Sequence, residues 1–471
     1  MYSARYRYHP CMRSLMKLVF LLIGLVCLAA GGAWVWAGSA AGPQIAFRGP
    51  EKFVGQVTPL ELVVDSPDGK FSRVDVTLEQ GGQTFPVFNL EQPAESTVRQ
   101  DTANRLYISR PIGKQALPEL KPGAARIVVR AARPVAFGIR QAESEATRDV
   151  EVRLEPPQVA VLSTFHYINH GGAEFVVFRA TPADVESGVR VGDKSYPGFA
   201  GSAVGIKDPA ARVAFFALPP DEDLMTPITV YARDGAGNEA VASLDHRPFA
   251  KPFQRSRIAI DDRFLQHVVP QIAAASPQKQ YSTAPDAMLA SFLKINGDLR
   301  RENNAFIAEL TKKSAPTMLW HGPFKALTNA AVEARFADNR TYVYQGKDVD
   351  QQVHLGFDLA VTAMIGVTAA QDGRVVHASD LGIFGNCVII DHGLGVQSLY
   401  GHLSSIGVKV GDTVTMGRVI GRSGTTGLAL GDHLHFTMLV NGNAVNPVEW
   451  WDPKWTEDRI TRKIREAGGG V

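Results

Sequence analysis

Short runs in which apolar and polar residues alternate fill much of this 471-residue chain, and they restrict most of it to β-structure. Four such runs lie between residues 43 and 155: "PLELVVDS", "SRVDVTLEQ", "ARIVVRAA" and "RDVEVRLEP". A period of two places successive side chains on opposite faces of a strand. Because turn residues separate the runs at short intervals, residues 43–155 are predicted to form an antiparallel β-sandwich.

A second set of strand-like runs occupies residues 157–250 and includes "AEFVVFRA" and "RVAFFALP". The segment "YARDGAGNEA" resembles the closing strand-turn-strand of bacterial immunoglobulin-like modules. The chain is therefore expected to be mainly β, with one or two immunoglobulin-like β-sandwich modules before its C-terminal part.

The period changes in residues 256–314, where apolar residues recur at spacings of three and four. This segment is predicted to be a helical linker, with Asp286 and Asp298 as helix starts. Residues 315–453 are again strand-like and rich in glycine, and they are expected to form the C-terminal domain. Residues 454–471 are charged and end in glycines, which predicts a tail with a short helix and a frayed end.

The N-terminal residues 1–40 contain an apolar stretch that is long enough to span a bilayer, from Leu18 to about Ala37. Arg5, Arg7, Arg13 and Lys17 precede it, and positive residues on that side predict a cytoplasmic N-terminus. We expect a single-pass anchor in the inner (cytoplasmic) membrane, with the remaining chain outside the cytoplasm. A cleaved signal peptide is the alternative, because "AGSA" has the small residues of a cleavage site.

Charge and cysteine content exclude several classes of function. Lys+Arg 49 against Asp+Glu 47 give a formal net charge of +2, and no basic run with aromatic residues is present. Nucleic acid is therefore not expected as a partner. Of the three cysteines, only Cys387 lies beyond the apolar stretch, so no disulfide can form within the exported part. Cys387 lies in "GNCVIIDHG", a pattern typical of a buried strand, and is expected to be a core residue.

Histidines gather in the C-terminal domain. Six of the chain's 12 lie between positions 354 and 435, at 354, 377, 392, 402, 433 and 435. "HLGFD" supplies His354 and Asp358, and their spacing of four puts both side chains on one side of a strand or helix. "GDHLHFTM" places His433 and His435 on one face of a strand. Two imidazoles and a carboxylate are a common zinc ligand set, and such a site keeps a fourth position for water or substrate.

These motifs resemble those of the lysostaphin/LytM-type zinc endopeptidases that cut peptidoglycan. The resemblance covers residues from about 322 to 451, and rests on "HLGFD", "YGHL", "HLH", "GNCVIIDHGLG", "VKVGDTVTMGRVIGRSGTTG" and "NPVEWW" in the family's order. It implies an antiparallel β-sheet peptidase domain with a zinc groove. It also implies that His354, Asp358 and His435 bind Zn²⁺, and that His402 and His433 are catalytic residues beside the metal.

The proposed chemistry needs no glutamate of the HExxH type, and the sequence has no HExxH motif. An imidazole beside the metal can take a proton from water or stabilise the oxyanion. His392 is expected to be a second-shell or core residue, and His377 a packing residue. His321 and Asn339 are weaker candidates for an upstream arm that approaches the metal, as found in some family members.

The sequence thus predicts a membrane-anchored zinc endopeptidase that hydrolyses peptide cross-links or stems of peptidoglycan. The β-modules would carry the catalytic domain from the membrane toward the wall. Two alternatives come from other classes of function: a non-enzymatic LytM-type regulator of cell-wall amidases, and an envelope scaffold protein. Five occupied chemical positions argue against the regulator, since such relatives have lost their metal residues.

Overall fold

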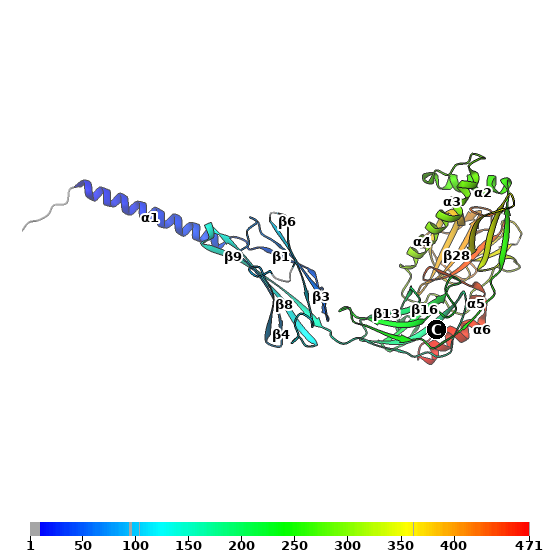
Figure 1. Cartoon of the computed structure of the whole chain (residues 1–471), viewed down its shortest axis with the longest axis horizontal. Coiled ribbons are helices and arrows are strands. Elements are labelled where there is room, and N and C mark those ends of the chain that lie inside the picture. The colour runs from blue at the N-terminus through cyan, green and yellow to red at the C-terminus, as the bar shows by residue number, and fades with distance from the viewer. Residues whose placement is uncertain (1–9, 94–96, 103, 361, 471) are drawn as a thin grey trace, which may run out of the picture. The chain divides into compact units, whose positions relative to one another are not determined.

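The computed structural model describes residues 10–93, 97–102, 104–360 and 362–470, and their order along the chain is shown in Figure 1. The predicted positive residues Arg5 and Arg7 lie outside the described residues. The fold is mainly β, as predicted. The chain forms two compact units, Met1–Pro156 with Gly235–Asn238, and Pro157–Asp234 with Glu239–Val471.

The first unit begins with one long apolar helix, α1 (Pro10–Gly38). Its stretch Ser14–Trp36 is long and apolar enough to cross a membrane. Large apolar side chains along it, such as Leu28 at 75% and Trp36 at 76%, are exposed. A helix that is apolar all round and unburied suits a lipid environment, although a signal sequence has the same composition.

Two sheets follow α1 and enclose one apolar core. One sheet has the order β1 (Gln44–Gly49), β3 (Thr58–Asp65), β7 (Arg105–Ile112), β6 (Thr97–Thr102). The other has the order β2 (Phe53–Val54), β9 (Arg140–Val152), β8 (Gly123–Val135), β4 (Arg73–Gln80), β5 (Gln83–Asn89). All strand pairs in the two sheets are antiparallel except β2 with β9. In β3 and β4, alternate residues such as Leu60, Leu62, Val74 and Val76 are buried, which is the predicted period of two.

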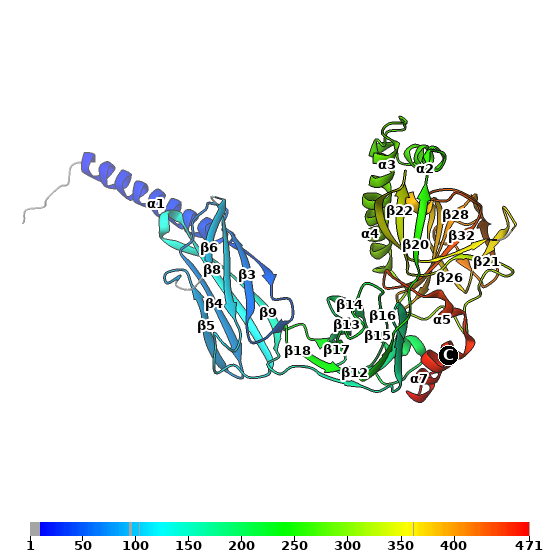
Figure 2. The same ribbon diagram turned by 45° about the vertical axis from the view of Figure 1, so that its right-hand side comes forward.

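The second unit starts with two four-stranded sheets (Figure 2). The first has the order β10 (Gln158–Val161), β12 (Gly172–Thr181), β16 (Ala211–Leu218), β15 (Phe199–Ala200). The second has the order β14 (Lys194–Pro197), β13 (Glu186–Val191), β17 (Ile228–Arg233), β18 (Glu239–Ser243). A short parallel pair joins β11 (His166–Asn169) to β19 (His246–Phe249). Every residue of β16 is buried, so this strand has core on both faces.

The helical segment packs on the C-terminal sheets, with α2 (Asp262–Ala275) near α3 (Met288–Lys294) and with α4 (Arg300–Thr311) running along the strands (Figure 2). Helix α2 is capped at its N-terminus by Asp261, whose carboxylate accepts from the amide of Phe264. Helices α3 and α4 are joined without a break by a π-helical turn, Ile295–Leu299. The predicted helix start at Asp298 is therefore wrong. Gly297 weakens a helix by only about 1 kcal/mol, and packing of the flanking apolar residues keeps it continuous.

The C-terminal part is built on one long antiparallel sheet. Its strand order is β21 (Ala331–Ala334), β24 (Phe357–Ala360), β32 (Leu434–Val440), β28 (Val396–Leu403), β27 (Asn386–Gly393), β26 (Gly373–Asp380), β30 (Thr413–Val414), and β33 (Asn443–Val445) also pairs with β32. Two three-stranded sheets flank it: β20 (Arg255–Ile260), β22 (Asp338–Tyr344), β23 (Lys347–His354), and β25 (Gly366–Thr368), β31 (Val419–Arg422), β29 (Ser405–Ile406).

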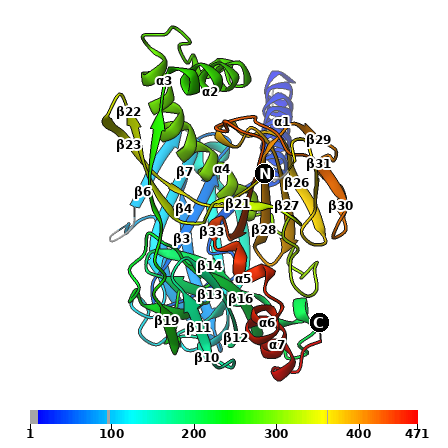
Figure 3. The ribbon, with the colours of Figure 1, turned by 90° about the vertical axis from the view of Figure 1, so that its right-hand side faces the viewer.

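The tail predicted from residue 454 onward contains helix, as expected, but this helix is packed against the strands. Helices α5 (Pro447–Trp451), α6 (Pro453–Thr456) and α7 (Arg462–Glu466) lie beside β12 and β16 in Figure 3. The Lys463 ammonium is fully buried and donates to the Glu174 carboxylate of β12 at 2.8 Å. A buried cation needs such a partner, and the nearest one lies 289 residues earlier in the chain.

The second set of strands and the C-terminal sheet share one apolar core, which differs from the separate modules expected for residues 157–250 and 315–453. Phe215 of β16 contacts Trp320 and Trp450, with ring centroids 6.3 and 5.8 Å apart. Both tryptophans are fully buried. The C-terminal sheet is thus supported on one side by the second set of strands.

Candidate metal centre

The five residues singled out by their motifs come together at one end of the long sheet. His354 is the last residue of β23, and Asp358 lies in β24. Asp358 pairs with His435 across the β24–β32 ladder, and Gly401, beside His402, pairs with His435 from β28. Antiparallel pairing therefore joins Asp358 and His435, which are 77 positions apart in sequence.

Three atoms converge on one point. His354 Nε2 lies 3.0 Å from Asp358 Oδ1, His435 Nδ1 lies 2.9 Å from the same oxygen, and the two nitrogens are 3.1 Å apart. All three residues are at most 8% exposed. This is the His/Asp cluster among the described residues whose ligand atoms are close enough to hold a metal ion.

In each imidazole, the hydrogen bond of the ring nitrogen that points away from the cluster fixes the position of the ring hydrogen. His354 Nδ1 lies 3.1 Å from the Arg335 carbonyl, which can only accept, so Nδ1 carries the hydrogen. His435 Nε2 lies 3.0 Å from Thr437 Oγ1, whose hydroxyl donates to the Leu355 carbonyl at 3.0 Å. His435 Nε2 therefore donates to Thr437. His354 Nε2 and His435 Nδ1 are left as lone pairs that face each other and a carboxylate oxygen.

This donor set fits a metal ion. Two nitrogen lone pairs and a carboxylate oxygen offer no hydrogen to one another, so a cation is the natural occupant of the point between them. In a tetrahedral zinc site with bonds of about 2.0–2.1 Å, ligand atoms are about 3.3 Å apart. The observed separations of 2.9–3.1 Å are close to that value.

His402 and His433 lie beside this cluster, and they are oriented in the same way. Their ring centroids are 4.8 Å apart, and the His402 ring lies 5.6 Å from that of His435. His402 Nδ1 donates to the Thr426 carbonyl and His433 Nδ1 to the Gly431 carbonyl, both at 2.8 Å. Each therefore keeps Nε2 as a lone pair.

The loop Ser423–Gly431, "SGTTGLALG", supplies both of these carbonyls. It is therefore a positioning element for two histidines, which the sequence alone did not reveal. His402 has φ 61°, a conformation that non-glycine residues rarely adopt. Such strain at a buried histidine is typical of functional sites.

Burial and neighbouring charges shift the pKa values in the cluster. Burial would raise the pKa of Asp358, but the adjacent His354 and His435 hold it well below its usual value. Burial lowers the pKa of His435 to about 4. Burial, reinforced by His433 and His435, holds the pKa of His402 well below its usual value. The centre thus combines an anionic carboxylate at Asp358 with neutral imidazoles at His402 and His435, and a carboxylate beside a neutral imidazole is the state that binds metal.

Two further residues complete the centre. Arg340 Nη2 donates to Asp358 Oδ2 at 3.1 Å, and its Nε lies 3.4 Å from Asp338, so the guanidinium holds the carboxylate with Oδ1 toward the histidines. No sequence motif identifies Arg340 as a site residue, and it lies 18 residues before Asp358. Gly356 is the other: a Cβ there would lie 2.5 Å from the His435 ring, so the glycine of "HLGFD" makes room for that imidazole.

The remaining candidates lie outside the cluster. His392 is fully buried, with Nδ1 at 2.6 Å from the Asp372 carbonyl and Nε2 at 2.7 Å from Ser398 Oγ. His377 packs edge-on against Phe306, and Cys387 is a buried free thiol. The His321 side chain is exposed. Asn339 bonds to the Ala337 carbonyl at 3.3 Å and lines a neighbouring cavity.

Comparison with known proteins assigns this part of the chain. The sequence model of peptidase family M23 matches residues 352–447, a range that contains all five motif residues. Residues 352–447 form a peptidase family M23 domain. This confirms the resemblance to lysostaphin/LytM-type peptidases. Because the family is one of metallopeptidases, it implies a metal at the His/Asp cluster of the M23 domain.

Curated relatives agree over the same domain. The DD-carboxypeptidase/endopeptidase Mpg of Neisseria meningitidis serogroup B is 41% identical over 97 residues, 21% of this chain and 22% of the relative. The peptidoglycan DD-endopeptidase ShyA of Vibrio cholerae is 41% identical over 96 residues, 20% of this chain and 22% of the relative. The chain thus matches less than a quarter of the length of either relative. Among solved structures, the catalytic domain of lysostaphin from Staphylococcus simulans aligns at 25% identity and TM-score 0.20, over 31% of this chain and 96% of that one.

Proposed function

We propose that this protein is a zinc-dependent endopeptidase that hydrolyses peptide cross-links or stems of peptidoglycan in the cell envelope. The observation that carries the proposal is the convergence of His354 Nε2, Asp358 Oδ1 and His435 Nδ1 beside two further imidazoles with free Nε2 atoms. The names of the Neisseria and Vibrio relatives support the substrate class.

In this proposal His354, Asp358 and His435 hold Zn²⁺, and Arg340 fixes the orientation of Asp358. Zinc, when bound, supplies Lewis acidity that polarises an amide carbonyl and acidifies water. Peptide hydrolysis adds a hydroxyl to the carbonyl carbon and leaves one proton to be moved to the departing nitrogen. The chain's own groups for that transfer are His402 and His433.

The free Nε2 atoms of His402 and His433 can accept this proton and return it. Since their rings lie 4.8 Å apart, protonation of one disfavours protonation of the other. Once protonated, an imidazolium Nε2–H can also donate to the oxyanion that develops on the substrate.

Placement in the envelope is part of the same proposal. α1 would act as an inner-membrane anchor, with Lys17 at its cytoplasmic end and the M23 domain outside the cytoplasm. A reporter enzyme that is active only outside the cytoplasm, fused to the C-terminus, is expected to be active. Activity of a cytoplasmic reporter at the same position would refute this orientation.

Digestion of purified peptidoglycan by the zinc-loaded full chain tests the activity. Mass analysis should find newly released muropeptides with the wild type and none with Asp358→Ala. His321→Ala is the matched control, because it removes an exposed histidine of the same half of the chain and should leave the products unchanged. If wild-type protein with full zinc content releases no fragment, the endopeptidase assignment fails, and the amidase regulator becomes the better hypothesis.

A further inference from the structure

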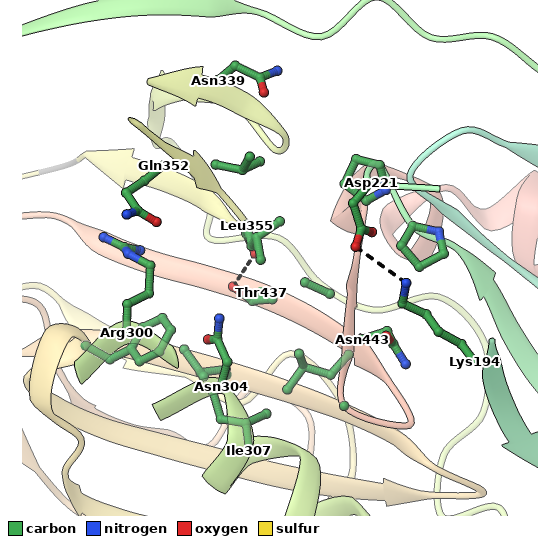
Figure 4. Close-up of a pocket in the computed structure, with 18 of the residues that line it drawn as sticks. Lys194, Asp221, Arg300, Asn304, Ile307, Asn339, Gln352, Leu355, Thr437 and Asn443 are labelled. Atoms are coloured by element: carbon green, nitrogen blue, oxygen red, sulfur yellow. Dashed lines mark hydrogen bonds and ion pairs between the residues drawn. The ribbon is translucent and has the colours of Figure 1, made fainter. Parts of the chain in front are cut away.

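A cavity of about 580 Å³ lies next to the metal centre and has no part in the mechanism above. It is lined by Leu399 of β28 and Leu439 of β32, and Asn304 and Ile307 of α4 lie on one side (Figure 4). The Gln352 side chain of β23 lies beside the Arg300 guanidinium, and Asp221 lies on the other side of the cavity. Several of these walls lie outside the M23 match, so they belong to this chain's own architecture.

The cavity adjoins the metal centre, because two residues that contact His435 also line it. In β32, a period of two puts His435, Thr437 and Leu439 on one face of the sheet. Thr437 accepts from His435 and also lines the cavity. Phe384 also connects the two sites: it lines the cavity, and its ring centroid lies 5.4 Å from that of His435. A peptide cut at the metal centre would therefore have one end directed along this face into the cavity.

One cationic side chain in the cavity lacks an anion. Arg300 donates through Nε to the Asn296 carbonyl at 3.0 Å and through Nη2 to Asn296 Oδ1 at 2.6 Å. Among the described residues, no carboxylate forms an ion pair with it. Lys194, the other cation of the lining, is paired with Asp221 and Glu222.

A largely buried guanidinium without an ion pair is costly. Burial lowers the pKa of Arg300, and the more distant carboxylates of Asp350 and Asp358 offset this only in part. Its Nη1 has no partner within the described chain, and Figure 4 shows the guanidinium directed toward Gln352. The amide of Asn304 is also without a hydrogen bond and is exposed to the cavity. The Gln352 amide is already bonded to the Asp350 carboxylate. The Arg300 guanidinium and the Asn304 amide, in a cavity also lined by Leu399 and Leu439, suit a carboxylate carried by a small apolar residue.

We infer that this cavity binds the C-terminal carboxylate of the peptide stem, with Arg300 as its ion-pair partner. This inference rests on the proposed function, since it names the part of the substrate that would occupy the space beside the metal centre. It makes Arg300 a specificity-determining residue: substrates with a free C-terminal carboxylate are favoured over those in which that carboxylate is blocked.

Binding rather than cleavage provides the primary test. A peptidoglycan pentapeptide stem with a free C-terminal carboxylate, and the same peptide as its C-terminal amide, are titrated calorimetrically into the zinc-loaded full chain. Because hydrogen bonds to charged groups contribute about 1.5–3 kcal/mol, the free acid should bind about 10- to 100-fold more tightly than the amide. Equal Kd values for acid and amide in the wild type would overturn the inference.

Variants locate the carboxylate. Arg300→Gln should abolish the preference for the acid, whereas Arg301→Gln, which alters an exposed neighbour paired with Asp298, should retain it. Asn304→Asp is a second variant at an exposed position without hydrogen bonds, and its negative charge should weaken binding of the acid more than of the amide. It decides the question by itself if Arg300→Gln does not fold. An unchanged preference in Asn304→Asp or in folded Arg300→Gln would refute the site.

The same titrations separate this inference from the proposed function. If the wild type binds the acid preferentially, and Asn304→Asp weakens that binding, but peptidoglycan is not cleaved, the carboxylate site stands and the endopeptidase assignment fails. If peptidoglycan is cleaved but acid and amide bind equally, the enzyme stands and the carboxylate site fails.

Discussion

The buried carboxyl of Glu449 should make the stability of the second unit depend on pH. Its Oε1 accepts from Asn169 Nδ2 at 2.7 Å and its Oε2 from the Ala173 amide at 2.8 Å, so it joins α5 to β11 and β12. Burial raises the pKa of Glu449 from 4.5 to about 7. The folded state therefore holds a proton that the unfolded state releases above pH 4.5.

The sign and the size of the effect follow from this shift. A raised pKa contributes stability that is fully present below pH 4.5 and is lost as the pH rises through about 7. A difference of about 2.5 pH units corresponds to about 3 kcal/mol, at 1.36 kcal/mol per unit. His166 and His392 act in the opposite direction, because burial lowers the pKa of each to about 4 and they destabilise the fold as the pH falls from 6.5.

The variant Glu449→Gln isolates the carboxyl from these histidines. Its amide can donate to Asn169 after that side chain is flipped, while its oxygen still accepts from Ala173, so the packing is kept without a titrating group. The free energy of unfolding is measured by urea titration of the full chain in detergent, followed by the fluorescence of tryptophans such as the adjacent, buried Trp450.

Subtracting the variant's unfolding free energy from that of the wild type cancels the histidine contribution. The difference should fall by about 3 kcal/mol between pH 4.5 and pH 8. The same difference in unfolding free energy, calculated for the exposed variant Glu309→Gln, should not change with pH. A Glu449 difference that varies by less than about 1 kcal/mol, or that grows as the pH rises, would refute the reasoning.

Three further predictions concern the metal centre. Asp358→Ala should purify with far less than one zinc per chain by elemental analysis, because only two ligands remain; full occupancy would mean that the ligand set is wrong. His402→Ala and His433→Ala should keep their zinc and lose about 10²–10⁴-fold in the rate of peptidoglycan cleavage, and wild-type rates at matched zinc content would remove the catalytic assignment. Arg340→Gln should weaken zinc binding about 10- to 100-fold in competition with a chelator, because Asp358 loses its orienting partner. Tighter binding in that variant would show that repulsion between the guanidinium and the metal outweighs orientation.

Local patterns in the sequence carried the prediction of the fold class and of the five residues at the centre. A period of two is a property of neighbouring residues, and it identified the strands of the first unit. The spacings in "HLGFD" and "HLH" are likewise local. Because the β24–β32 pairing places Asp358 opposite His435, these short motifs need only one long-range contact to form the cluster.

The features that the sequence did not reveal depend on long-range contacts without a motif. Arg340 reaches Asp358 because β22 pairs with β23, and nothing in "ADNRTY" marks that arginine as different from others. The carbonyls of Thr426 and Gly431 orient His402 and His433, but a backbone carbonyl has no sequence signature. The helix that continues through Gly297 is a further case, since packing there outweighs the local preference for a helix end.

The core that joins the second set of strands to the M23 domain has a genetic consequence. Truncation of a buried phenylalanine typically costs about 3–5 kcal/mol, a large part of the stability of most domains. A substitution at Phe215, whose ring lies against Trp320 and Trp450, would therefore unfold the catalytic part without altering any residue of the family match. A screen for loss-of-function alleles should collect mutations in β16 as readily as in β32, and the second set of strands would be inherited with the peptidase as a single gene segment.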